Sequence, residues 1–305
     1  MFGMMEAMLS FLRRQVGLRT DAADAAGSLH AKVRGLFSPG FPLVPFAGFA
    51  YDGNFNPSSN TDLPWPCYYW DTVNIGAGIT VTVPSPGLFA FANTITISGL
   101  LTASGKGAKG GTAKSSSNSP VAGENGASGG GYLGGGGGGG GSTDAFGSNG
   151  GIGGNGRASG GDASVSNPGS SGNAWTIFEP LNLLMPIAKY LAGGGGGSGG
   201  VYNGTSGAGG AGGGFIILCC KSLTINAGGV IRADGVNGGN ASGTQAGGGG
   251  GGGGGAVIVI TSSLTENDTI SASGGAGGSG VGSDVGNRAY NGGAGGNGVA
   301  KVLII

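Results

Sequence analysis

Apolar and polar residues alternate in four short segments of the chain. Residues 72–83, for example, read TVNIGAGITVTV, with apolar side chains at every second position on both sides of a Gly-Ala-Gly step. Such alternation is typical of half-buried strands, and Gly, Asn or Asp between two runs predicts a turn. The same pattern recurs in residues 95–104, 223–234 and 264–273.

A second, more apolar strand is predicted just ahead of three of these segments. These strands are residues 88–92, 215–219 and 256–260, and a further one is residues 300–305. The expected unit is therefore strand, turn, strand, turn, strand, followed by a glycine-rich excursion that returns to the next apolar strand. Because no unit can bury its apolar face alone, we expect a mainly β and irregular fold whose units stack into one solenoid- or sandwich-like core.

Residues 1–37 have a helical pattern instead. Their apolar side chains recur at spacings of three and four, which predicts two short helices. We expect this apolar stripe to attach the chain to another subunit; an ordinary core helix is the alternative. The stripe consists of Met5, Met8, Leu9, Leu12 and Val16 in the first helix and of Leu29, Val33 and Leu36 in the second.

Residues 38–104 are predicted to hold a connector and the first β repeats. Residues 39–66 are rich in Pro, Phe, Asn and Ser and have no sustained period, so an irregular connector is expected. Aromatic side chains are expected to anchor it by packing. They are Phe46, Phe49, Tyr51, Trp65, Tyr68, Tyr69 and Trp70.

Glycine dominates residues 105–305. The chain of 305 residues has 79 Gly but only 12 Pro, which excludes a collagen helix. The excursions are residues 105–214, 235–255 and 274–298. A flexible linker is the default expectation, because glycine loses the most backbone freedom on ordering. The ordered alternative, which we favour, is a lattice of polyproline-type glycine helices (polyglycine II) bonded sideways, with Ala, Ser and Asn on outer faces or at turns.

The composition argues against an enzyme and against a nucleic-acid-binding protein. Lys plus Arg and Asp plus Glu both number 14, so the net charge is zero and no basic surface is predicted. The single histidine, His30, falls in the helical N-terminal part, and no nucleophile, base and orienting group are recognised together. We therefore expect no enzymatic activity, no cofactor and no nucleic-acid partner.

Metal and disulfide sites are not predicted either. Cys67, Cys219 and Cys220 have neither disulfide-framework nor metal-ligand spacing and are expected to be small buried apolar residues. Glu266 and Asp268 lie on a short turn, and two carboxylates fall short of the six oxygens that calcium takes.

Two features resemble a known family. Residues 17–33 (GLRTDAADAAGSLHAKV) resemble a segment near the N-termini of phage structural proteins. The β repeat followed by glycine-rich excursions looks like the glycine-rich tail-fibre proteins and tip adhesins of tailed bacteriophages. The resemblance implies a polyglycine II sandwich with loops that bind a host-surface receptor, either a glycan or an outer protein. It also implies an N-terminus that contacts other virion proteins and a homotrimeric fibre exposed on the particle.

Other functional classes stay open at this point. A bacterial surface or sheath protein that assembles through its own repeats is the main alternative. An ice-binding polyglycine bundle is a weaker one, because it would need a flat face of evenly spaced small residues, and the spacing along the sequence is irregular. The first apolar stretch is followed, not preceded, by basic residues, the reverse of a signal peptide, so assembly in the host cytoplasm is expected.

Receptor contacts are expected where side chains interrupt the glycine, because glycine offers no chemical variety. Isolated aromatic residues, with nearby polar residues as partners, are the candidates. They are Tyr132, Phe146, Tyr202 and Tyr290, with Asp144, Asn203 and Arg288. The alternative is that these aromatics only cap the ends of the lattice. The apolar stretch 175–191 is assigned to packing or to a subunit contact.

Overall fold

The computed structural model describes residues 52–127, 134–143, 149–154, 191–266, 268–282 and 289–304. The chain divides after Tyr51 into two compact units, and all of the described residues belong to the second. The predicted N-terminal helices and every attachment residue from Met5 to Leu36 lie outside the described residues. What is described is mainly β structure with almost no helix, and it contains no helix long and apolar enough to cross a membrane.

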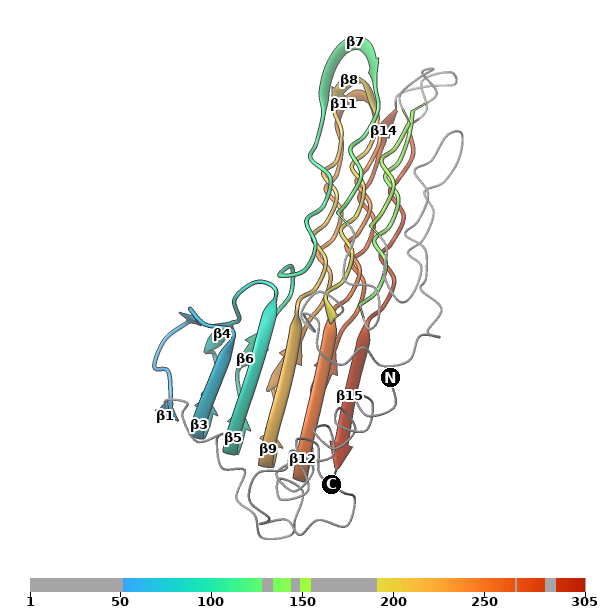
Figure 1. Ribbon diagram of the computed structural model, residues 1–305. Coiled ribbons are helices and arrows are strands. Elements are labelled where there is room, and N and C mark those ends of the chain that lie inside the picture. The colour runs from blue at the N-terminus through green and yellow to red at the C-terminus, as the bar shows by residue number, and fades with distance from the viewer. Residues whose placement is uncertain are drawn as a thin grey trace, which may run out of the picture. The chain divides into compact units, whose positions relative to one another are not determined.

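The strands form three sheets (Figure 1). The six-stranded parallel "long sheet" has the order β1-β3-β5-β9-β12-β15, and the five-stranded parallel "short sheet" has the order β13-β10-β6-β4-β2. The four-stranded antiparallel "distal sheet" has the order β14-β11-β8-β7.

The bounds of the strands follow this division. The long sheet contains β1 (Gly53–Phe55), β3 (Cys67–Ile75), β5 (Gly87–Ile97), β9 (Phe215–Ile225), β12 (Ala256–Glu266) and β15 (Val299–Ile304). The short sheet contains β2 (Thr61–Asp62), β4 (Thr80–Thr82), β6 (Leu100–Thr102), β10 (Val230–Arg232) and β13 (Thr269–Ser271). The distal sheet contains β7 (Ser115–Val121), β8 (Val201–Thr205), β11 (Ser242–Ala246) and β14 (Val281–Gly282).

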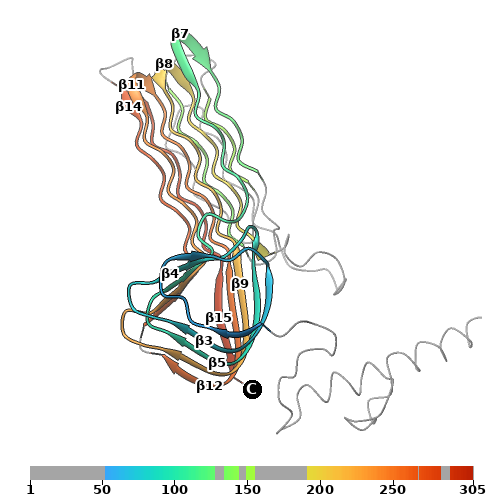
Figure 2. The same ribbon diagram turned by 90° about the vertical axis from the view of Figure 1, so that its left-hand side faces the viewer.

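Successive coils of chain stack around one apolar core (Figure 2). The chain passes from the long sheet to the short sheet and back, and equivalent residues of successive coils pair with each other. Ile97 pairs with Ile75 on one side and with Ile225 on the other, and all three are almost fully buried. The predicted stacking of β units into one continuous core is therefore found.

Each long strand bends where the sequence predicted a turn. In β5, alternate residues are buried up to Ala92, and the alternation resumes out of phase at Ile95. The pairing of β5 with β9 omits Asn93, and the pairing of β9 with β12 omits the equivalent Lys221. The predicted turn between two strands is wrong, because the ladder of paired residues continues on both sides of this bend.

The connector is more regular than predicted, since β1 and β2 already belong to the long and short sheets. Phe55 of β1 stacks on Trp70 of β3, with ring centroids 4.8 Å apart, and this pair covers the first end of the core. Trp65 is 67% exposed, so its predicted packing role is wrong. A strand of two or three residues is too short to show an alternating pattern. The other anchors before residue 52 lie outside the described residues.

Backbone hydrogen bonds join the glycine-rich segments side by side. The N–H groups of Gly250, Gly251 and Gly252 donate to carbonyl oxygens of three different segments at 2.8 to 2.9 Å. The N–H groups of Gly253, Gly254 and Gly255 return to the same segments in the same order. Each neighbour is thus met again at every third residue, and an isolated flexible linker does not describe this part of the chain.

Segment 247–255 lies inside the resulting "glycine bundle". Its carbonyl oxygens accept hydrogen bonds from further segments, so neighbours surround it. They are segments 135–142, 193–200, 207–214, 233–239, 272–278 and 290–299.

The sequence predicted that Ala, Ser and Asn lie on the outer faces of the bundle or at its turns, but not every such side chain does. Ser142, Ser198 and Ser206 are buried. The hydroxyl of Ser198 accepts the N–H of Glu124 at 2.7 Å, and that of Ser206 accepts the N–H of Lys114 at 2.9 Å. Ser198 and Ser206 thus replace a backbone acceptor, which explains why a polar side chain is tolerated there, whereas the buried Oγ of Ser142 has no hydrogen-bond partner among the described residues.

Asx side chains complete the hydrogen bonding at one edge of the bundle. Asp234, Asn237 and Asn240 occupy every third position of one segment. Their side-chain oxygens accept backbone N–H groups of segment 273–279 at 2.7 to 2.9 Å. Each therefore supplies an acceptor to a segment at the surface of the bundle, where a further backbone neighbour is absent among the described residues.

A second row of this kind is interrupted at Ala294. Asn297 and Asn291 accept the backbone N–H groups of Gly274 and Gly280, each at 2.9 Å. Nothing described accepts the N–H of Gly277, which lies midway between these two donors. We expect Ala294→Asn to raise the free energy of unfolding by about 0.5 to 1 kcal/mol, because it adds one hydrogen bond. Urea denaturation measures the change. Ala294→Ser, whose hydroxyl is too short, is the control, and an equal gain in both variants would contradict the prediction.

Candidate functional site

The distal sheet forms where glycine segments reverse direction, at the end of the bundle away from the long sheet (Figure 1). β8, for example, joins segment 193–200 to segment 206–214. Neighbouring reversals pair with one another, β7 with β8 and β8 with β11, to give an antiparallel sheet. The bundle therefore carries a small sheet made of side-chain-bearing residues.

A small apolar cluster holds the distal sheet together. Val201, Ala241 and Ala246 are buried, and Val121 and Val281 pack against them. Its members come from all four strands of the distal sheet, with Ala241 just before β11, so the cluster ties the separate reversals to one another. Its burial fixes which side chains point outward.

The outward-facing side chains of β7 and β11 are small and mostly polar. Hydroxyl and amide groups predominate, and no acid or base is among them. The exposed residues are Ser115, Ser117, Asn118, Ser119, Pro120, Ser242, Gly243 and Thr244. This surface can donate and accept hydrogen bonds to a polar, uncharged ligand, and none of these exposed residues is an acid or a base that could activate a hydroxyl group.

The outermost part of β7 arches away from β8. Ser117 pairs with Asn203 and Val121 pairs with Val201, so β7 has extra residues between these pairs. Asn118 lies in this arch with φ of 60°, a left-handed conformation that asparagine tolerates well. The amide of Asn203 donates to Oδ1 of Asn118 at 3.1 Å, which fixes the arch to β8.

The described candidate residues lie at this same end of the bundle. Tyr202 and Asn203 belong to β8 and are half-buried. Tyr290, also half-buried, follows Ala289, which forms a β-bridge with Thr143. The carbonyl of Tyr290 accepts the N–H of Gly248 at 3.0 Å, just after the end of β11. Sequence reasoning thus selected three residues that the fold gathers at one end of the bundle.

The remaining candidates lie outside the described residues. They are Tyr132, Asp144, Phe146 and Arg288.

An ion pair lies below the distal sheet. Nζ of Lys114 is 3.2 Å from the carboxylate of Glu124, which also accepts a hydrogen bond from the hydroxyl of Thr112. The hydroxyl of Thr112, and after it Lys114, lower the pKa of Glu124. Because both side chains of the ion pair are exposed, it contributes little to stability.

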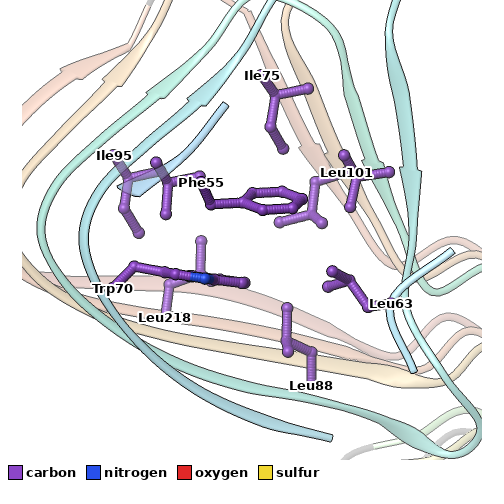
Figure 3. Close-up of a pocket in the computed structure, with 10 residues that line it drawn as sticks. Phe55, Leu63, Trp70, Ile75, Leu88, Ile95, Leu101 and Leu218 are labelled. Carbon is purple, nitrogen blue, oxygen red and sulfur yellow. The ribbon is translucent and has the colours of Figure 1, made fainter. Parts of the chain in front are cut away.

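The apolar cavity of the core offers no reactive side chain. Aromatic and aliphatic side chains line it, among them Phe55, Trp70, Leu63 and Leu88. They point toward one another between the two parallel sheets (Figure 3). No lining residue carries an acid, a base or a nucleophile. The cavity is a gap in core packing.

The cysteines differ in exposure, and this corrects one expectation. Cys67 is exposed, Cys219 is half-buried and only Cys220 is buried. Burial raises the pKa of Cys220 to about 11. In the part of the chain that is described, no three His, Cys, Asp or Glu side chains cluster as metal ligands would.

We expect Cys220 to resist thiol reagents at pH 8 while Cys67 reacts. Because folding raises the pKa of Cys220 from its ordinary value near 9, its contribution to stability is complete below pH 9 and is lost as the pH rises toward about 11. Mass spectrometry after maleimide labelling at pH 8, and urea unfolding between pH 8 and 11, measure both effects. Cys220→Ala is the control: it should flatten this part of the stability profile.

Two functional features escaped the sequence reasoning. The exposed part of β7, SSSNSPV, reads as a loop because it lacks alternating apolar residues. The row of Asx acceptors carries a detectable signal, since Asp234, Asn237 and Asn240 are spaced at every third position, the period of a helix with three residues per turn.

Comparison of the chain with protein-family models, with curated proteins and with solved structures found no match.

Proposed function

We propose that this chain is a non-enzymatic fibre or adhesin of a tailed bacteriophage, which presents the distal sheet to a receptor on the host surface. One observation carries the proposal: a side-chain-rich sheet stands at the end of a hydrogen-bonded glycine bundle, away from the apolar β core. The bundle is then a stem, and the distal sheet and nearby aromatic residues are the contact surface.

We propose further that the segments of the stem are polyglycine II helices. A β-strand forms hydrogen bonds in one plane, with a period of two, whereas segment 247–255 bonds to three different neighbours in rotation. A helix with three residues per turn points its backbone groups in three directions and supports this pattern. At a rise of about 3.1 Å per residue, this segment alone would contribute roughly 28 Å to the stem.

The chemistry of the distal sheet supports a receptor that is polar and uncharged at the contact. Exposed hydroxyl and amide groups pair with hydroxyl groups of glycans or with backbone amides of an outer protein. Tyr202 and Tyr290 would add apolar area that is rigid when bound. In this proposal the N-terminal part attaches the fibre to other virion proteins, and copies of the chain associate as trimers.

Location on the particle tests the function. Antibodies raised against the full chain should label tail appendages of intact particles in immunogold electron microscopy. The purified full chain, added to host cells first, should reduce particle adsorption. Labelling of the bacterial envelope in cells that hold no particles, with no effect on adsorption, would overturn the proposal in favour of a bacterial surface protein.

An ice-binding protein is the second candidate, and one observation favours it. Ser273, Ala276 and Ser279 are exposed at every third position, beside a parallel row of Asn291, Ala294 and Asn297. This face is more regular than the sequence indicated. Thermal hysteresis of the purified chain separates the candidates: ice binding requires a measurable gap between melting and freezing points, and the adhesin proposal predicts none.

A further inference from the structure

The two faces of the long sheet bury different apolar clusters. The inner face holds the core between the two parallel sheets. On the outer face, side chains of successive strands form a second apolar surface, here called the outer patch. Its residues are Tyr69, Phe89, Phe91, Phe215, Ile217, Cys219, Ala256, Ile258 and Ile260, which alternate along their strands with the core residues.

The outer patch is covered at one point by Leu191. Leu191 is 5% exposed and forms a buried cluster with Phe215 and Ala256, with Phe89 and Ile217 packed against it. Phe89 and Phe215 meet edge to face, with ring centroids 5.0 Å apart. Leu191 is therefore the only residue outside the long sheet in this cluster of described residues, and it marks where another part of the chain reaches the patch.

Leu191 is also the last residue of an apolar stretch. Residues 175–190, WTIFEPLNLLMPIAKY, contain two charged side chains and are otherwise mostly apolar. Such a stretch needs a nonpolar surface to pack against, because exposing it to water is unfavourable in proportion to its apolar area. Leu191 links the stretch to the patch, because it directly follows the stretch in the sequence and packs on the patch in the fold.

The stretch is long enough to cross the patch. The patch residues belong to β3, β5, β9 and β12, which lie side by side, so the patch is roughly 14 Å across at about 4.8 Å per strand. Even coiled as a helix, residues 175–190 would reach about 24 Å at 1.5 Å per residue, and more if extended. The polar pair Asp71 and Asn93, hydrogen bonded at 2.6 Å, borders the patch on β3 and β5.

We propose that residues 175–190 pack on the outer patch of the same chain and fix the joint between the β core and the glycine stem. Covalent connection through Leu191 keeps the stretch at high local concentration near the patch, which favours this occupant over a second copy of the chain. Leu191 continues through Ala192 into segment 193–200, which lies inside the bundle. The cover is thus tied to the stem at one end and seated on the long sheet.

Cys219 reports on the cover, because its thiol lies in the outer patch and burial raises its pKa. In the full chain with Cys67→Ser and Cys220→Ala, Cys219 is the one thiol. We expect Leu183→Asp combined with Leu184→Asp to speed maleimide labelling of Cys219 roughly tenfold or more, since the cover would open. Ser170→Asp with Ser171→Asp, in the same excursion but outside the apolar stretch, is the matched control and should leave the rate unchanged.

Three results would overturn the proposal: an unchanged rate in the Leu183 and Leu184 variant, faster labelling after deletion of residues 1–37, or protection that rises with protein concentration. The last would indicate a second copy.

A cross-link provides a measurement that does not depend on a destabilised variant. Photo-reactive benzoylphenylalanine in place of Phe91 should cross-link to residues 175–190 of its own chain in a mixture of isotopically light and heavy protein. Cross-links between light and heavy chains would contradict the proposal.

Discussion

Gly251→Ala should destabilise the glycine bundle by about 3 kcal/mol or more, beyond the usual range for overpacking a core. An added Cβ would lie 2.0 Å from the carbonyl oxygen of Gly275 and 2.5 Å from its carbon. These are backbone atoms, and they cannot rotate away as a flexible side chain would. Gly275 is itself held, because its N–H donates to the carbonyl of Gly252 at 2.8 Å. Relief therefore requires two segments to separate and their hydrogen bonds to break.

Urea unfolding and the thermal midpoint measure this loss. Gly76→Ala is the matched control, since its added Cβ would meet only the Cγ1 atom of Ile79 at 3.8 Å, an ordinary contact. Ala276→Val adds bulk within the same bundle, but at an exposed position. Both controls should change stability by less than about 1 kcal/mol. Equal losses in Gly251→Ala and Gly76→Ala would show that close packing of segments is not what glycine provides here.

The β core could be predicted from the sequence because its signal is local. The alternation that places Ile75 and Val81 in the core is visible in a dozen residues, and the repeat of that pattern indicated stacked coils. The bend at Asn93 was mistaken for a turn, because a polar residue that breaks the alternation has the same appearance in both cases. Only the pairing with neighbouring strands distinguishes them.

The distal sheet could not be predicted because its cause is not local. β7 and β14 contain no pattern of their own and become strands by pairing with reversals far away in the sequence, as Ser115 does with Thr205. Aromatic residues isolated among glycine nevertheless pointed to this end of the bundle. What the sequence could not supply is their exposure: Tyr202 and Tyr290 are half-buried, so their side chains also pack.

Replacing Tyr202 and Tyr290 separates a role in receptor binding from a role in packing. If the proposed adhesin function holds, Tyr202→Ala combined with Tyr290→Ala should weaken binding of the full chain to host cells about thirtyfold or more, as loss of two aromatic anchors at a contact does. The thermal midpoint should fall by no more than a few degrees, because both residues are only half-buried and Tyr290 keeps its backbone hydrogen bonds to Ser142 and Gly248.

The measurements are cell binding by flow cytometry and thermal unfolding, made on the same preparations. Val236→Ala is the control: Val236 is 45% exposed on the stem, so removing it changes exposed apolar area without touching the distal sheet. Unchanged binding would remove both tyrosines from the contact surface. A large drop in thermal midpoint together with lost binding would assign them to closing the end of the glycine bundle, because anchoring the reversals would then be their main contribution. Binding lost at unchanged stability is the outcome that a receptor surface predicts, since the receptor would cover the part of each residue that is exposed in the free chain.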